Sequence, residues 1–181
     1  MAANNPSFRQ RIPVGKQYLI TRNQALHLSP SNFTQFMNKS TVYGVVVDMP
    51  MSPTVITSLV CYVNGAANLY FSNGSDYSGA AQRYPGVVQA SRVFVNNAMH
   101  FVNDENKAES LELPNSRSHL AYILTTGGIH RVEISPFANQ QTPEQHAFFT
   151  LYQRVMAELR NAQMKDQASG IDPKAVIVPN A

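Results

Sequence analysis

The residues best suited to chemistry lie in a polar loop, Ser72–Gly79, and directly after it at Arg83 and Tyr84. Small polar residues and glycines between a strand and a helix can offer backbone N–H groups to an anion, and the guanidinium of Arg83 matches phosphate or carboxylate oxygens. The loop has neither the Gly-Lys-Ser/Thr ending of a phosphate-binding loop nor the glycine spacing of a dinucleotide fingerprint, and plain surface turns share its composition. We therefore expect a surface turn, with an anion or ligand site as the alternative. The residues of that alternative site are Ser72, Asn73, Gly74, Ser75, Arg83 and Tyr84.

The other reactive residue types form no pattern typical of an active site. The single cysteine, Cys61, lies in an apolar run and excludes an internal disulfide or a multi-cysteine metal site. The serines lack a Gly-x-Ser-x-Gly motif, and Asp48, which ends a predicted strand beside Pro50, is interpreted as an acid that faces solvent. No two histidines have the i, i+4 spacing of a metal site; they are His27, His100, His119, His130 and His146. We predict no metal, no cofactor and no catalytic residue, and we favour a protein that is not an enzyme.

Charge is distributed unevenly along the chain. The net charge is +3, yet residues 1–39 carry five basic residues and no acid, whereas residues 40–162 carry seven basic and nine acidic residues. A basic segment can attract nucleic acid, an anionic surface or the acidic body of a neighbouring subunit, but five charges over 39 residues make no dense patch. We therefore expect no nucleic-acid binding. The acidic stretch is interpreted as a solvated connection that would attract the basic arm of a neighbour; it contains Asp104, Glu105, Glu109 and Glu112.

Length and composition predict one globular domain with loose ends. The chain has 181 residues and is 44% apolar, enough for one sizeable core. We predict a basic, partly ordered arm over residues 1–30, a single α+β domain over 31–162 and a flexible tail over 163–181. No stretch approaches the roughly 18 apolar residues of a membrane span, and the first residues lack the apolar core of a secretory signal. These features predict a cytoplasmic protein with no membrane insertion.

Five strands are predicted, as one single strand and two hairpins. Asn64-Gly65 and Gly127-Gly128 each separate two apolar runs and favour the two-residue turn of a hairpin. The single strand is a β-branched run that ends before Pro50, because proline lacks the backbone donor of a sheet ladder. The predicted strands are 42–49, 55–63, 66–72, 119–126 and 129–135.

Two long helices complete the domain. Apolar residues recur every three or four positions over 85–102, which indicates a helix buried over much of its girth. A second helix begins after Thr142, where an N-cap threonine is followed by Pro143 and by Gln145 of a capping box. We expect this helix to fray after Arg160, where the sequence becomes polar.

Three shorter segments have weaker patterns. Residues 31–39 favour a short helix capped by Ser31, and residues 17–21 a brief extended piece within the arm. The apolar segment 174–179 is interpreted as a disordered end, with a strand added to a sheet edge of this or another chain as the alternative.

Both faces of the first hairpin are apolar. Pairing across Asn64-Gly65 places Val63 opposite Ala66 and leaves hardly any polar residue on either face, whereas a sheet with one wet face should carry a polar side. In the second hairpin one face is apolar and the other mixed; the apolar face carries Ala121, Ile123, Val132 and Ile134, and the mixed face Leu120, Tyr122, Leu124, Arg131 and Glu133.

Because two helices can cover one face, the other must be covered by the N-terminal segment, by the tail or by another subunit. We favour a homodimer; the alternative is an arm that folds back with Phe8, Tyr18 and Leu19. The interface residues proposed on this basis are Leu59, Cys61, Val63, Tyr70, Tyr122 and Leu124.

The elements together predict a two-layer α+β sandwich, an antiparallel sheet of about five strands with two long helices in the order β-β-β-α-β-β-α. The function expected from it is a non-catalytic protein-interaction or assembly module that acts as a homo-oligomer, with itself or another protein as partner. The alternative is a small-molecule or anion-binding domain that uses the loop over residues 72–84, and it requires a concave pocket bordered by Arg83 and Tyr84.

Overall fold

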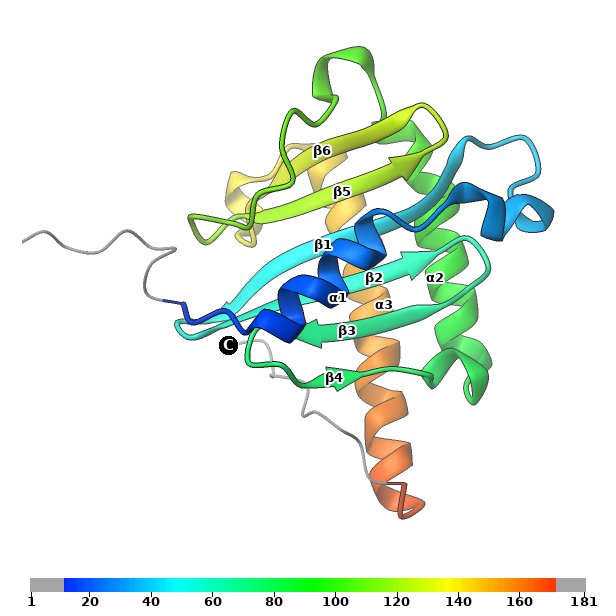
Figure 1. Cartoon of the computed structure of the whole chain (residues 1–181), viewed down its shortest axis with the longest axis vertical. Helices are drawn as coiled ribbons and strands as arrows, with labels where there is room; N and C mark the ends of the chain where they lie inside the picture. The colour runs from blue at the N-terminus through cyan, green and yellow to red at the C-terminus, as the bar shows by residue number, and fades with distance from the viewer. Residues whose placement is uncertain (1–11, 172–181) are drawn as a thin grey trace, which may run out of the picture.

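The computed structural model describes residues 12–171, which form one antiparallel sheet flanked by helices (Figure 1). The six strands have the order β4-β3-β2-β1-β5-β6, which confirms the α+β sandwich with one strand more than expected. They are β1 (Val42–Ser52), β2 (Val55–Tyr62), β3 (Ala67–Phe71), β4 (Asp76–Tyr77), β5 (His119–Thr125) and β6 (Gly128–Ile134). The additional strand, β4, has two residues within the polar loop, too few for a sequence pattern to reveal.

Helices α2 (Pro85–Asn97) and α3 (Pro143–Ala168) cover one face of the sheet and enclose the main core. Phe94 of α2 lies against Phe148 and Tyr152 of α3, with ring centroids 5.3 and 5.9 Å apart. The helix predicted over 85–102 is confirmed as α2 continued by a 3-10 turn, η4 (Ala98–Phe101).

The start of α3 follows the sequence closely. The hydroxyl of Thr142 accepts from the backbone N–H of Gln145, whose side chain accepts from the backbone N–H of Thr142, so the capping box is confirmed. The end of α3 does not: the helix continues to Ala168 and does not fray after Arg160. Its last turns are retained because Ala162, Gln163 and Asp166 are buried.

The second face of the sheet is covered by α1 (Lys16–Leu26), which crosses β1, β2 and β3 in Figure 1. The extended piece predicted over 17–21 is therefore wrong. Tyr18, Arg22 and Leu26 are spaced by four residues and are all buried against the sheet, so tertiary contacts supply what the weak apolar pattern did not. The arm thus folds back as intramolecular cover in its described part, although Leu19 stays 43% exposed and Phe8 lies outside the described residues.

The register of the first hairpin differs from the prediction by one residue. Tyr62 donates to Ala66 O and Cys61 pairs with Ala67, so Val63-Asn64-Gly65 is a three-residue loop. A two-residue turn of the predicted type needs positive φ at both central residues, whereas in this turn only Gly65, with φ 95°, has it. The shift moves every side chain of β3 relative to β2: Asn68 and Tyr70 lie on the α1 face, with the even-numbered residues of β2.

The second hairpin turns one residue earlier than predicted. Thr125 pairs with Gly128, and Ile123, not Thr125 as predicted, lies opposite His130. Because the pairing shifts by two positions, an even number, the apolar and mixed faces keep their predicted members.

The short helix predicted over 31–39 is a 3-10 helix, η2 (Pro30–Phe36), and Ser29 caps it in place of Ser31. Its Phe33 is buried against Tyr43 and Tyr62, with centroids 5.9 and 4.7 Å away. The remaining 3-10 turns are η3 (Ala80–Gln82), η5 (Asp104–Asn106) and η6 (Ala138–Gln140). The segment 174–179 lies outside the described residues.

Candidate functional site

The hydrogen-bonding groups of the polar loop are satisfied by neighbouring residues of the fold. Ser72 is buried: its backbone N–H donates to Ile56 O, its hydroxyl accepts from Ile56 N–H, and its carbonyl accepts from Gly15 N–H. The side chain of Asn73 accepts from the backbone and the hydroxyl of Ser75, which closes the turn locally. The structure therefore does not bring Ser72–Ser75 together with Arg83 and Tyr84 in one site.

Arg83 and Tyr84 meet at the carboxylate of Asp166, near the end of α3. Asp166 Oδ1 accepts from Arg83 Nε at 3.1 Å and from the Tyr84 hydroxyl at 2.5 Å. Its Oδ2 accepts from Arg83 Nη2 at 2.6 Å and from the Tyr77 hydroxyl at 2.7 Å. The hydrogen bonds from Arg83, supported by those from the tyrosines, outweigh burial and lower the pKa of Asp166 to about 2.

This cluster joins the end of α3 to η3 and β4, and it engages the guanidinium group of Arg83. Two of the guanidinium nitrogens of Arg83 bind Asp166 and the third donates to Gly79 O at 3.2 Å. An incoming anion would have to compete with a carboxylate that already has bidentate geometry. Sequence reasoning missed Asp166 because it lies 83 residues from Arg83 and no local pattern connects them.

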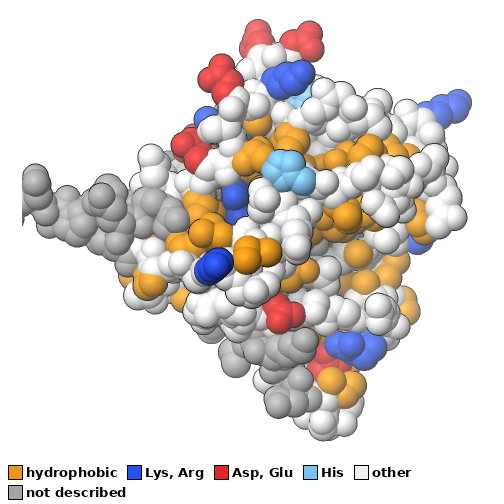
Figure 2. Space-filling model, viewed as in Figure 1, with side chains coloured by type: hydrophobic (Ala, Val, Ile, Leu, Met, Phe, Trp, Pro, Cys, Tyr) orange, Lys and Arg blue, Asp and Glu red, His pale blue; other side chains and the backbone are white. Residues whose placement is uncertain are grey.

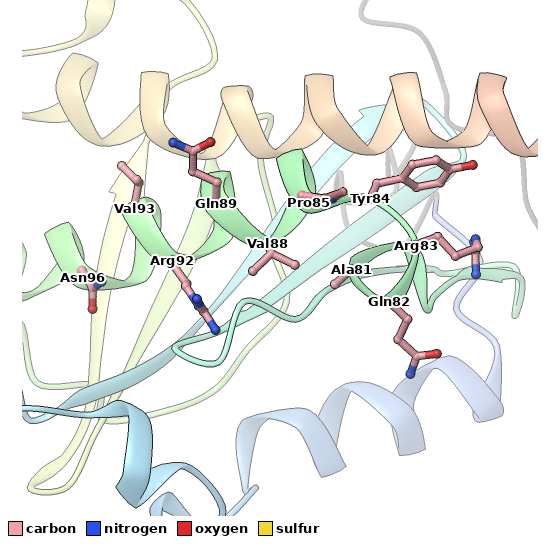
Figure 3. Close-up of a pocket in the computed structure, with 10 residues that line it drawn as sticks. All are labelled: Ala81, Gln82, Arg83, Tyr84, Pro85, Val88, Gln89, Arg92, Val93 and Asn96. Atoms are coloured by element: carbon pink, nitrogen blue, oxygen red, sulfur yellow. The ribbon is translucent and has the colours of Figure 1, made fainter.

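An open groove of about 570 Å³ runs along the outer flank of α2 and begins beside this cluster (Figure 3). It is lined by Ala81, Gln82, Arg83, Tyr84, Pro85, Val88, Gln89, Arg92, Val93 and Asn96. The members from α2 recur every three or four residues, so they form one stripe of the helix, opposite the residues that enter the core. Arg83 and Tyr84 border the groove, as the ligand-binding alternative requires.

Arg92 supplies the groove with a cation that has no ion pair among the described residues. Its Nη2 donates to Asn64 O at 3.2 Å, and its guanidinium lies 5.9 Å from the ring centroid of Phe36. These two contacts hold the side chain against the β2–β3 turn and leave further N–H donors. Val88 packs close to the same turn, where its Cγ1 would lie only 2.5 Å from a Cβ at Gly65.

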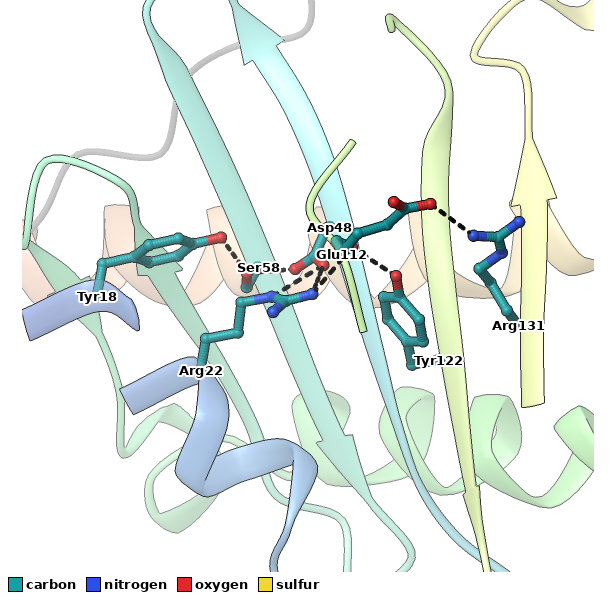
Figure 4. A network of polar contacts seen from close by, with 7 residues as sticks. All are labelled: Tyr18, Arg22, Asp48, Ser58, Glu112, Tyr122 and Arg131. Carbon is teal, nitrogen blue, oxygen red and sulfur yellow. Dashed lines mark hydrogen bonds and ion pairs between the residues drawn. The ribbon is translucent and has the colours of Figure 1, made fainter. Parts of the chain in front are cut away.

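A second polar network is buried between α1 and the sheet (Figure 4). Asp48 is fully buried and accepts from Arg22 Nε and Nη2 at 3.0 and 2.6 Å and from the Ser58 hydroxyl at 2.6 Å. The Ser58 hydroxyl also pairs with that of Tyr18 at 2.7 Å. The interpretation of Asp48 as an acid that faces solvent is therefore wrong, because β1 continues past it and α1 covers it.

The network extends to the segment that precedes β5. The backbone carbonyl of Glu112 accepts from Arg22 Nη2 at 3.3 Å and from the hydroxyl of Tyr122 at 2.5 Å. The side chain of Glu112 pairs with Arg131 at the surface, 2.9 Å away. Every charged or hydroxyl group of this network is satisfied by a structural partner, so the network fastens α1 to β1, β2 and β5.

The histidines and Cys61 have structural environments. His119 is buried, and its Nδ1 lies 2.7 Å from the hydroxyl of Tyr152; burial lowers the pKa of His119 to about 4. His130 contacts the side chain of Asn106 at 2.9 Å. Burial raises the pKa of the Cys61 thiol to about 12, which keeps it protonated and unreactive. Between residues 12 and 171, no group of three or more His, Cys, Asp and Glu side chains could hold a metal ion.

The residues proposed for a dimer interface lie inside the protomer. Leu59, Cys61 and Val63 are buried, as are Tyr122 and Leu124, and Tyr70 is half-buried beside the small cluster around Tyr18. The apolar faces do need cover, as the sequence indicates, but in the described part of the chain α2, α3 and α1 provide it. These six residues therefore offer no open apolar surface to a partner.

Comparison with known proteins assigns no relative: no family model, no curated protein and no solved structure matches the chain. Within the described residues, none of the helices combines the length and apolarity needed to cross a bilayer.

Proposed function

We propose that this chain is a non-catalytic protein-interaction module that docks its partner in the groove along α2. The observation that carries the proposal is the groove itself, a stripe of exposed and half-buried side chains that combines apolar residues with an arginine that has no ion pair in the described residues. Arginine beside apolar contact area is the composition in which binding energy concentrates at protein interfaces.

The shape of the groove favours a protein segment over a small molecule. Pockets for small ligands enclose most of the ligand surface, whereas this groove is shallow and follows α2 from Pro85 to Asn96. Val93, near the Asn96 end of the groove, is 38% exposed. An extended or helical segment laid along α2 could cover Val88 and Val93 together and place a carboxylate at Arg92.

The second candidate function is the binding of a small anionic ligand at the Arg83 end of the same groove. It is favoured by the position of Arg83 and Tyr84 on the rim and opposed by the hydrogen bonds that commit Arg83 to Asp166. Titration with inorganic phosphate tests it: chemical-shift changes confined to the backbone amides of residues 81–84 and 86 would support this candidate over the first.

A photo-cross-linking amino acid placed in the groove tests the main proposal. It is introduced at Gln89 or Val93, two exposed groove positions, and at Ala157, an exposed control position on α3 that does not line the groove. In the cells that produce the protein, we expect the two groove positions to give an adduct with the same partner, reduced by Arg92→Glu, and Ala157 to give none. Equal adducts from all three positions, or none from the groove, would contradict the proposal.

A further inference from the structure

A preshaped acidic knob projects from the edge of the sheet opposite to β4. The 3-10 turn η5 (Asp104–Asn106) contacts β6 and rises above it in Figure 1. Asp104 and Glu105 are exposed on this turn, Glu109 follows it, and none of the three has an ion pair in the described structure. Acidic side chains gather at the top of Figure 2, in the same region of the molecule, with basic side chains among them; the segment also carries the exposed Lys107, so its acids outnumber its base.

Local hydrogen bonds fix the shape of the knob. Asn103 caps η5 through the backbone N–H groups of Glu105 and Asn106, and the side chain of Asn106 donates to Phe101 O at 2.6 Å. The His130 side chain and the bond from Ala108 N–H to Ile129 O hold the turn against β6. A turn that is already ordered loses little conformational entropy when it binds, which favours its use as a docking element.

The charges around the groove have the opposite balance. Arg92 is free of ion pairs in the described structure, and the Lys165 ammonium lies 5.5 Å from the ring of Tyr84 at the groove's end. Arg83 is neutralised by Asp166, and Glu158 approaches the start of α2 at Gly86. The positive charge nearest the middle of the groove is therefore that of Arg92.

We propose that the groove of one copy receives the acidic knob of a second copy, with Glu105 or its neighbour Asp104 paired to Arg92. The inference rests on the proposed function and names its partner. Charge complementarity between two surfaces of the same chain carries it. Within the described residues of one protomer the two surfaces are not paired: Arg92 contacts the β2–β3 turn and Phe36, η5 contacts β6, and no ion pair joins Arg92 to Asp104 or Glu105.

The geometry of this contact sets the form of the assembly. Two different surfaces meet, so the contact is head-to-tail and each copy keeps a free knob or groove until a ring closes. A groove and one turn bury less area than the roughly 1,000 Å² of a stable interface, so the association is weak and sensitive to salt.

Sedimentation of the purified full chain tests the inference. At low salt, about 0.02 M, we expect the average mass to rise with concentration past that of a dimer, and to return to a monomer at about 0.5 M salt. Arg92→Glu and Glu105→Arg should each weaken the association at least about tenfold, and the double variant should restore it. The two single variants change the net charge in opposite directions, so an effect of net charge alone would change their association in opposite directions. Val93→Asp changes an exposed groove residue whose side chain makes no hydrogen bond; it should also weaken the association and serves where Arg92→Glu impairs folding.

A wild-type chain that stays monomeric at low salt overturns the inference, as do single variants that associate like wild type or a double variant that is not restored. The proposed function fails separately. If the chain is monomeric but the cross-linker at Val93 captures a different protein, the groove is a docking surface and only the identity of its partner is wrong.

Discussion

Removal of the Asp48 carboxylate should destabilise the protein far more than removal of the whole ion pair. In Asp48→Ala, Arg22 stays on the buried face of α1, where its side chain is only 7% exposed and has lost its counter-ion. An uncompensated buried charge costs about 3–5 kcal/mol. With a urea slope of about 2 kcal/mol/M, the midpoint of unfolding should fall by about 1.5–2.5 M.

The double variant Arg22→Met, Asp48→Leu should unfold within about 1–2 kcal/mol of wild type. Ser58 can still pair with Tyr18, and the carbonyl of Glu112 still accepts from Tyr122, so neither substitution leaves a buried polar group alone. Arg131→Met is the matched control, because it breaks an ion pair whose partners are 37% and 59% exposed and should cost less than about 1 kcal/mol. If the double variant unfolds as easily as Asp48→Ala, the loss comes from packing and the reasoning about charge is refuted.

Three further predictions concern the rest of the fold. Gly65→Ala should cost about 1–3 kcal/mol more than Gly74→Ala in thermal unfolding, because the two glycines have φ of 95° and 94° but only the Cβ at 65 would meet Val88; equal losses would contradict the packing argument. The pKa of His119 is lowered to about 4 in the folded state from about 6.5 in the unfolded chain. The contribution of neutral His119 to the free energy of unfolding is therefore complete above pH 6.5, and about 3 kcal/mol of it is lost as the pH falls to 4. Urea midpoints at pH 7 and 4.5 should therefore differ less in His119→Asn than in wild type, and an unchanged difference would exclude His119 as the cause. Asp166→Asn should speed amide exchange in the last two turns of α3 at least about tenfold, with no change near Thr142; uniform acceleration would mean that the Arg83 cluster stabilises the whole domain.

Local patterns predicted most of the sheet and both long helices. The hairpins are encoded by adjacent runs of apolar residues, and α3 begins where the Thr142 capping box places it. The register of the first hairpin could not be read from Asn64-Gly65 alone, because it depends on whether one or both residues adopt positive φ. A single dihedral angle thus decided which side chains of β3 face α1.

Both polar clusters depend on contacts between residues far apart in the sequence, which local patterns do not reveal. The helix α1 has a weak apolar pattern, and its position is set by Arg22 and Asp48, which lie 26 residues apart. Arg83 was identified as the cation of a possible site, but its counter-ion, Asp166, lies in a stretch interpreted as a flexible tail. Arg92, in contrast, could have been noticed, because it is a charged residue on the exposed stripe of a helix whose buried face was already predicted.

Because α1 covers the second sheet face, a symmetric dimer through that face and a head-to-tail assembly through the groove make different demands on Asp48. A symmetric dimer through the second sheet face would need α1 to leave, and Asp48 would then be buried against the partner without Arg22, which is unfavourable. The double variant Arg22→Met, Asp48→Leu, which leaves no unpaired charge under α1, should therefore strengthen a dimer of that kind and leave a head-to-tail contact between the groove and the knob unchanged. Sedimentation of this double variant beside Arg92→Glu separates the two: if the first promotes a dimer and the second has no effect, the sheet face is the interface and α1 is its displaceable cover.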